Sequence, residues 1–266
     1  MKIQTTLTLI TAVLSIGVAP GRAHAGDNPV ELSASDIIKQ AAEKYASLTS
    51  YSDEGSTSAT LGTITATSYT FSINLARTNL YRIVWRQENQ SYTPNGVVWS
   101  AGDGNFLWMG RNFTPKKYAD WETALAGATG ISGGAAASIL GTFFKMNWGN
   151  QLGAAVANSQ RRADEKIGDV DCYVLTHGTD GRTNTLWIGK SDFLIHQVEN
   201  DTSAAFMKAI MEKEAKNNPQ IRALLESSGG NLFKDSKSIE THQNIRINPP
   251  LTRPDFDFKV PDAARP

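Results

Sequence analysis

The chain has 266 residues, of which 40% are hydrophobic, with 26 basic and 26 acidic residues and one cysteine. This length suits a single large globular domain with a substantial core. The balanced charge argues against a nucleic-acid partner, which requires clustered Lys and Arg, and the lone Cys172 excludes an intramolecular disulfide.

The N-terminal segment 1–25 predicts a cleavable export signal. Lys2 gives it a positive start, Leu7 to Ala19 form a short apolar run, and Ala23-His24-Ala25 is a small-x-small cleavage pattern, so we expect cleavage before Gly26. The residue immediately after the cleavage site is glycine and not the cysteine of a lipoprotein signal, and the apolar run is too short to span a membrane. We therefore expect a periplasmic mature chain, folded as a single domain over 26–266.

An amphipathic helix is predicted to begin at Ser33, which is a good N-cap followed three residues later by Asp36. Apolar residues then recur at helical spacing as far as Leu48. From Tyr51 the period changes to two, which predicts antiparallel strands joined by tight turns. The clearest of these strands lie around Tyr69–Leu75, Tyr81–Trp85, Val97–Trp99 and Phe106–Met109.

The segment Ala124–Phe144 contains no charged residue and is interrupted by glycines. Its length matches a membrane span, but glycine and alanine contribute little transfer energy. The composition favours a pair of short helices hinged by glycine, which could act as a mobile lid, with a packed insertion as the alternative.

The stretch 163–200 predicts a three-stranded antiparallel meander, with strands at Asp171–His177, Arg182–Ile188 and Phe193–Glu199. Asp180-Gly181 between the first two is a strong hairpin signal, because a primed turn needs positive φ angles. A helical hairpin over Ser203–Leu225 and a strand over 238–247 are predicted next. A final edge strand is expected at Phe256–Pro261, because prolines bound this short alternating run.

Few residues suggest catalysis or metal binding. Gly130-Ile131-Ser132-Gly133-Gly134 matches the G-x-S-x-G pattern of serine hydrolases, but that chemistry requires a strand immediately before the serine. His177, His196 and His242 lack the spacing of metal ligands. We therefore expect no metal, no cofactor, no enzymatic activity and a buried, inert Cys172, with a hydrolase using Ser132 as the least favoured alternative.

Three local patterns together resemble the periplasmic lipoprotein-carrier (LolA-like) family. Arg77-Thr78-Asn79-Leu80-Tyr81 is similar to the family's R-P-x-x-[FY] strand entry, and Gly102-Asp103-Gly104-Asn105-Phe106-Leu107-Trp108 to its D-G-x-x-L-W hairpin. Phe256-Asp257-Phe258-Lys259-Val260-Pro261 is similar to its closing F-x-F-x-P. The chain departs from the family where Thr78 replaces the proline and where Met109-Gly110-Arg111 follows the hairpin.

The resemblance implies a mainly β, α+β fold: an antiparallel incomplete β-barrel with a helical lid, here enlarged by insertions near 118–150 and 203–228. It further implies that an apolar concave face holds the acyl chains of a lipoprotein or related amphiphile. The family's strand-entry arginine, which bonds to the lid and steers its opening, would be Arg77.

The sequence thus predicts a monomeric carrier or sensor of a lipid-anchored protein or lipid-like amphiphile, which could deliver it to a membrane-associated acceptor protein. The alternative is a protein-interaction or regulatory module that docks partners through the Ser203–Leu225 hairpin. Besides Arg77, the expected cavity walls are Tyr69, Phe71, Ile73, Tyr81, Ile83, Trp85, Trp108 and Trp187, and the expected lid residues are Leu125, Ile131, Ile139, Leu140, Phe143 and Phe144.

Overall fold

The computed structural model describes residues 31–87, 96–110, 114–155, 158–227 and 233–260. Ser33–Pro266 form one compact unit, distinct from Met1–Leu32. The predicted export signal and its cleavage site lie outside the described residues.

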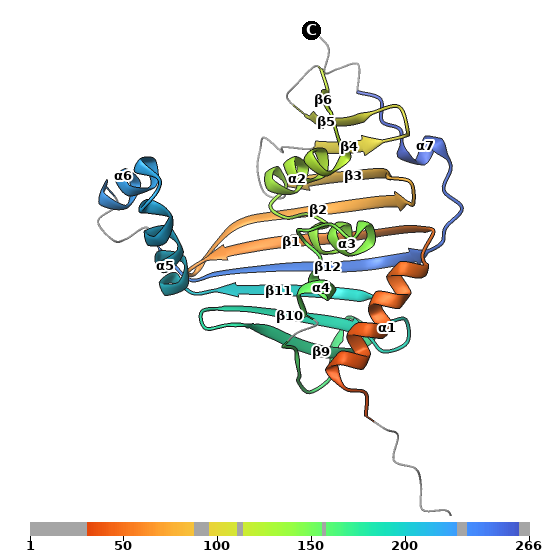
Figure 1. Ribbon diagram of the computed structural model, residues 1–266. Coiled ribbons are helices and arrows are strands. Elements are labelled where there is room, and N and C mark those ends of the chain that lie inside the picture. The colour runs from red at the N-terminus through yellow and green to blue at the C-terminus, as the bar shows by residue number, and fades with distance from the viewer. Residues whose placement is uncertain (1–30, 88–95, 111–113, 156–157, 228–232, 261–266) are drawn as a thin grey trace, which may run out of the picture. The chain divides into compact units, whose positions relative to one another are not determined.

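The described strands form one twelve-stranded sheet in which every neighbouring pair is antiparallel (Figure 1). The strand order is β6-β5-β4-β3-β2-β1-β12-β11-β10-β9-β7, and β8 also pairs with β9. The strands are β1 (Ser50–Leu61), β2 (Ile64–Ala76), β3 (Leu80–Gln87), β4 (Gly96–Ser100), β5 (Asn105–Met109), β6 (Lys116–Tyr118), β7 (Gln160–Arg161), β8 (Glu165–Ile167), β9 (Val170–Thr179), β10 (Arg182–Gly189), β11 (Ile195–Thr202) and β12 (Ser236–Ile247). The predicted open antiparallel sheet is confirmed.

Two consecutive meanders meet in the middle of this sheet. One runs from β1 to β6 and the other from β9 to β12, and they are joined by the pairing of β1 with β12, which places Gly55 opposite His242. Four helices lie over one face, as Figure 1 shows: α1 (Ala34–Ser47), α2 (Trp121–Ile131), α3 (Ala137–Phe144) and α4 (Gln151–Ala155). We call this helix-covered side the inner face and the opposite side the outer face.

The first helix begins where its sequence predicts. Ser33 caps α1 by accepting a hydrogen bond from the amide of Asp36 at 3.2 Å. Its buried residues Ile37, Ile38, Ala41 and Tyr45 follow helical spacing.

The uncharged segment is two short helices, as predicted. Helices α2 and α3 are separated by a turn with positive φ angles at Gly133 (64°), Gly134 (92°) and Ala136 (58°). Among the described residues, no helix is both long enough and apolar enough to cross a membrane.

The predicted final strand is wrong. Arg253–Phe256 form a short helix, α7, which begins with a reciprocal capping box between Thr252 and Asp255 and has Pro254 in its first turn. Its last residue, Phe256, is buried, and the following Phe258 and Val260 pack onto the cluster Val97, Trp99 and Trp108 on the outer face. The helix takes up Phe256, and residues 257–260 belong to no strand. Apolar packing of Phe258 and Val260 fixes the tail without strand pairing. Pro261 lies outside the described residues.

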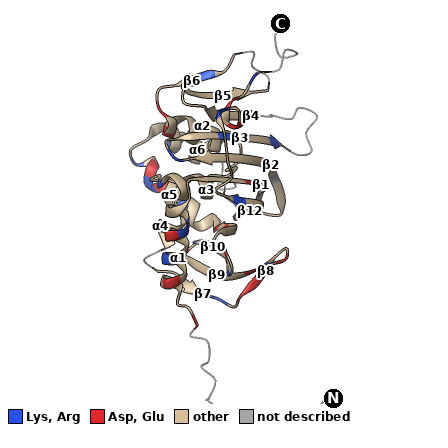
Figure 2. Cartoon of the chain, turned by 90° about the vertical axis from the view of Figure 1, so that its right-hand side faces the viewer, with Lys and Arg blue, Asp and Glu red and all other residues tan. Residues whose placement is uncertain are grey.

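The two remaining helices, α5 (Ala204–Ala215) and α6 (Pro219–Ser227), form the predicted helical hairpin between β11 and β12. Ser203 caps α5 through the amide of Phe206, and Asn218 accepts a hydrogen bond from the amide of Gln220 at the start of α6. Basic and acidic side chains alternate around α5, as Figure 2 shows.

Candidate functional site

Six of the eight predicted wall residues lie together on the inner face. Register pairs Phe71 with Trp85, Ile73 with Ile83 and Leu75 with Tyr81, and all of these side chains are buried. Tyr69, in phase with Phe71, contacts the turn between α2 and α3, where a Cβ on Gly133 would lie 2.8 Å from its ring. The part of the inner face formed by β2 and β3 is therefore strongly apolar.

The other two predicted wall residues, Trp108 and Trp187, lie on the outer face. Trp108 is paired with Val97 and packs against Phe258 at a ring separation of 5.3 Å. Trp187 packs with Cys172 and Val174 and donates a hydrogen bond from Nε1 to Glu165 at 2.9 Å. Alternation along each strand separates these two residues from the other six.

The predicted lid residues are mostly buried. Leu125, Ile139, Leu140 and Phe143 are at most 1% exposed, Phe144 is half-buried, and Ile131, at the end of α2, is 43% exposed. Aromatic rings from three elements fill the space beneath: Tyr51 of β1 lies 6.1 Å from Tyr45 of α1 and 6.5 Å from Phe143 of α3. We refer to α1, α2 and α3 as the lid helices.

Arg77 joins two of the lid helices to the end of β2. Its Nη2 donates to the carbonyl of Tyr45 at 2.7 Å and its Nε to that of Leu48 at 2.9 Å, both at the C-terminus of α1. Its Nη1 donates to the carbonyl of Phe143 at the end of α3, and the guanidinium carbon lies 4.2 Å from the centre of that ring. A cation at two helix C-termini satisfies carbonyls that have no partner within the helix.

Thr78, next to Arg77, has a φ of 69°. A proline ring fixes φ near −65°, so the proline that the family pattern carries at this position could not form this turn. The departure at Thr78 is therefore a consequence of the turn, which also has Asn79 at φ 62°.

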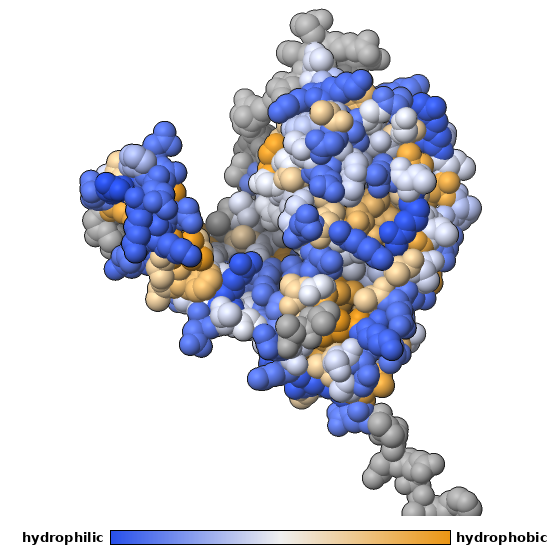
Figure 3. Space-filling view, viewed as in Figure 1, coloured by the Kyte–Doolittle hydropathy of each residue, from blue (hydrophilic) through white to orange (hydrophobic). Residues whose placement is uncertain are grey.

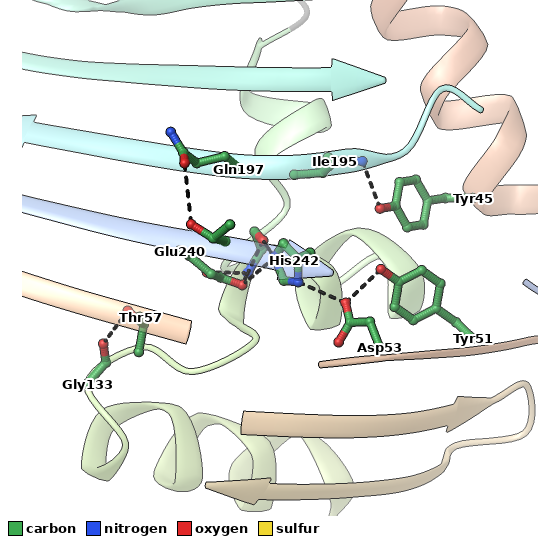
Figure 4. Close-up of polar contacts among 11 residues, drawn as sticks. Tyr45, Tyr51, Asp53, Thr57, Gly133, Ile195, Gln197, Glu240 and His242 are labelled. Carbon is green, nitrogen blue, oxygen red and sulfur yellow. Dashed lines mark hydrogen bonds and ion pairs between the residues drawn. The ribbon is translucent and has the colours of Figure 1, made fainter. Parts of the chain in front are cut away.

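A buried charge network, formed by Asp53, Ser138, Glu240 and His242, connects the sheet to α3 (Figure 4). His242 lies 2.8 Å from Asp53 through Nδ1 and 3.1 Å from Glu240 through Nε2. Ser138, in the first turn of α3, donates from Oγ to Glu240 at 2.8 Å, and Tyr51 donates to Asp53 at 2.7 Å. Glu240 also accepts from the amide of Ser138, so a carboxylate lies at a helix N-terminus.

The network holds a charged imidazole at neutral pH. Burial opposes protonation of His242, but the charges of Asp53 and Glu240 and their hydrogen bonds outweigh it and raise the pKa of His242 to about 10. Burial raises the pKa of Asp53, against the lowering effect of His242 and Tyr51. The imidazolium thus lies between two carboxyl groups.

Ser138, His242 and Asp53 follow one another as in a hydrolase triad, but their chemistry differs. Ser138 Oγ lies 3.3 Å from His242 Nε2, and the Glu240 carboxylate contacts both groups. An imidazole that is already protonated cannot accept the serine proton. The arrangement therefore stabilises charge and holds α3 in place.

Ser132 does not have the geometry of a nucleophile elbow. It follows the helix α2, its amide bonds to Ala128, and its hydroxyl donates to the carbonyl of Thr129 at 3.3 Å. A nucleophile elbow needs a strand at that point. Among the described residues, no group of three or more His, Cys, Asp or Glu side chains is arranged to hold a metal ion.

Sequence reasoning did not find the buried charge network. Asp53 lies two residues after Tyr51 on β1, and His242 lies two residues after Glu240 on β12. The period of two therefore places these ionisable groups on the same face as buried apolar residues. That signal was present at each position, but the contact between Asp53 and His242 depends on the pairing of two strands and joins residues 189 positions apart.

No family model matches the chain, and neither does any curated protein. Among solved structures, it is similar to LprF from Mycobacterium bovis with 11% identity and a TM-score of 0.44, over 86% of this chain and 96% of that one. The Pseudomonas aeruginosa MucA/MucB complex matches with 9% identity and a TM-score of 0.39, over 85% and 61%. The LolA superfamily protein NE2245 from Nitrosomonas europaea matches with 11% identity and a TM-score of 0.34, over 86% and 99%.

Proposed function

We propose that this chain is a non-enzymatic periplasmic carrier or sensor that takes up the acyl chains of a lipoprotein or related amphiphile between the inner face and the lid helices. Each methylene withdrawn from water contributes about 0.8 kcal/mol, so an acylated molecule needs cover in an aqueous compartment. The acyl chains would displace Tyr51 and Phe143, whose rings fill this space. Tyr69, Phe71, Ile73, Tyr81, Ile83 and Trp85 would then line the cavity.

The observation that carries this proposal is the position of Arg77. One side chain anchors both α1 and α3 through backbone carbonyls at their C-termini. Breaking these three hydrogen bonds disturbs neither a helix interior nor the strand ladder. Arg77 is therefore suited to the role of a reversible gate.

Replacing Arg77 by leucine should loosen the lid. We expect the association rate of a fluorescent fatty acid to rise severalfold and the free energy of unfolding to fall by about 2 kcal/mol, because charge-assisted hydrogen bonds to three carbonyls are lost. Stopped-flow fluorescence and urea titration measure the two effects. The control is Arg86→Leu, which removes the same charge from an exposed site on the outer face.

Binding itself is tested on protein purified from membranes. Native mass spectrometry should detect a co-purifying amphiphile, and the fluorescent fatty acid should bind the purified chain. If neither is found for the wild type or for Arg77→Leu, the carrier proposal is wrong.

A protein-interaction role is the second candidate, and the helical hairpin favours it. Only Ala215 of α5 and no residue of α6 is buried, while Met207, Ile210 and Leu224 are exposed large apolar side chains. Figure 3 shows apolar surface on this hairpin. Such surface commonly marks a docking site for a protein, which here could be a membrane-associated acceptor.

Deleting the hairpin separates the two roles. Thr202 of β11 pairs directly with Ser236 of β12, so a short turn can replace residues 204–234 without breaking the sheet. We expect fatty-acid binding to be unchanged and capture of a partner by crosslinking to be lost. Partner capture that survives the deletion excludes the hairpin as the docking site.

A further inference from the structure

A polar pocket of about 370 Å³ lies where α4 and the chain before it meet the β9–β10 hairpin. The polar side chains that line it are Asn147, Asn150, Gln151, His177, Thr179, Arg182 and Asn184. His177 and Asn184 are opposite each other in register and in phase with the buried pair Leu175 and Leu186, so the pocket opens on the inner face. Its volume suits a small polar ligand.

The side chains that line this pocket carry no negative charge. The lining contains amides, a hydroxyl, an imidazole and a guanidinium but no carboxylate. Arg182 has no ion-pair partner among the residues that the structure describes. His177 is 9% exposed, and its buried Nε2 has no hydrogen-bond partner in the described part of the chain. A buried polar atom at the wall of a pocket costs free energy unless a bound molecule satisfies it.

The pocket adjoins a second hollow, which lies between three helices. Asn150 also lines a smaller hollow of about 190 Å³ between α1, α3 and α4, whose other walls include Tyr45, Thr142 and Leu152. A polar pocket and a more apolar one therefore share a wall at Asn150. This arrangement fits a molecule with a polar head and an apolar tail.

We propose that the polar pocket is a subsite for the head group of an amphiphile that carries a phosphate monoanion and free hydroxyl groups. Arg182 would bind the phosphate through its fork of N–H donors, as guanidinium groups do. The amides of Asn147, Asn150 and Asn184 both donate and accept, which matches hydroxyl groups. His177 Nε2 would gain its missing partner. This assignment rests on the carrier function proposed above and names the class of its ligand.

Three probes separate head group from tail: lauroyl lysophosphatidylglycerol, the uncharged 1-lauroylglycerol, and free glycerol 3-phosphate. By calorimetry below micelle-forming concentrations, Arg182→Gln should weaken lysophosphatidylglycerol binding about tenfold and leave 1-lauroylglycerol binding unchanged. Arg86→Gln, on the outer face, is the matched control and should alter neither.

A second readout is the titration of His177 by NMR. The His177→Ala variant identifies the His177 signal by its loss from the spectrum. Burial and then the charge of Arg182 lower the pKa of His177 in the free chain. A phosphate at Arg182 should raise that pKa, whereas 1-lauroylglycerol should not.

Each further outcome overturns one of the two proposals. If both lipids bind but Arg182→Gln and the His177 titration are unaffected, the head-group subsite is wrong and the carrier function stands. If glycerol 3-phosphate binds as tightly as the lysolipid, the pocket serves a soluble phosphate ester and its assignment to an amphiphile is wrong. If no lipid binds, the carrier function itself fails.

Discussion

At the scale of single residues, the buried charge network makes stability depend on pH. The folded chain holds the His242 proton up to about pH 10, whereas the unfolded chain releases it near pH 6.5. The groups facing His242 are Asp53 and Glu240, with Tyr51 behind Asp53. The stabilisation is therefore complete below about pH 6.5, declines as the pH rises and is lost by about pH 10.

We expect the free energy of unfolding to fall by up to about 1.4 kcal/mol per pH unit within this window. Urea titration at pH 6.5 and 9 should show the decline in the wild type and a much smaller one in His242→Gln, with His196→Gln as the control. The pKa values of Tyr45 and Tyr51 are raised by burial, so these residues make stability depend on pH only above about pH 10. Should His242→Gln not fold, the NMR titration of His242 in the wild type decides: a midpoint near 6.5 contradicts the network.

Individual residue roles were only partly predictable. A local sequence pattern was enough to select Arg77 as a candidate site residue, and the structure adds its contacts with α1 and α3. The roles of Asp53 and His242 depend on the register of β1 with β12, which no local pattern encodes. The prediction also placed Trp108 and Trp187 wrongly with the other expected wall residues, because composition does not reveal which face of a strand the helices cover.

At the scale of elements, the turn between α2 and α3 depends on particular glycines. Gly133 has φ +64°, and a Cβ there would lie 2.8 Å from Tyr69, whereas Gly130 lies in α2 with open space around its Cβ position. Gly133→Ala should lower the free energy of unfolding by about 1–2 kcal/mol through backbone strain. Gly130→Ala should raise it by up to about 1 kcal/mol through helix propensity.

Thermal denaturation of the two alanine variants tests this contrast directly. Opposite shifts in the melting temperature are expected. Equal shifts in one direction would show that the turn does not require a left-handed residue at Gly133.

Most elements were predictable because local chemistry fixes them. The cap at Ser33, the Asp180-Gly181 turn and the helical hairpin between β11 and β12 all lie where the sequence predicts. The terminal segment was not, because its alternating apolar residues pack onto the outer face through their side chains, and the pattern does not reveal whether the backbone pairs with a strand.

At the scale of the whole unit, the sequence predicted two meanders but not their connection. Consecutive strands pair through short turns, which hydrophobic period and turn residues reveal. The junction of β1 with β12 is a contact between distant segments, for which the sequence alone offers several partners. The contacts between Asp53 of β1 and His242 of β12 follow from that junction.

This junction also sets an order of events during synthesis. β1 can pair with β2 as soon as both exist, but its second edge has no partner until β12, which begins only at Ser236, has been made. An exported chain would emerge with that edge bare, and an unpaired strand edge is the usual starting point of aggregation. Folding of the sheet is therefore completed at the β1–β12 junction, which requires the C-terminal strand β12.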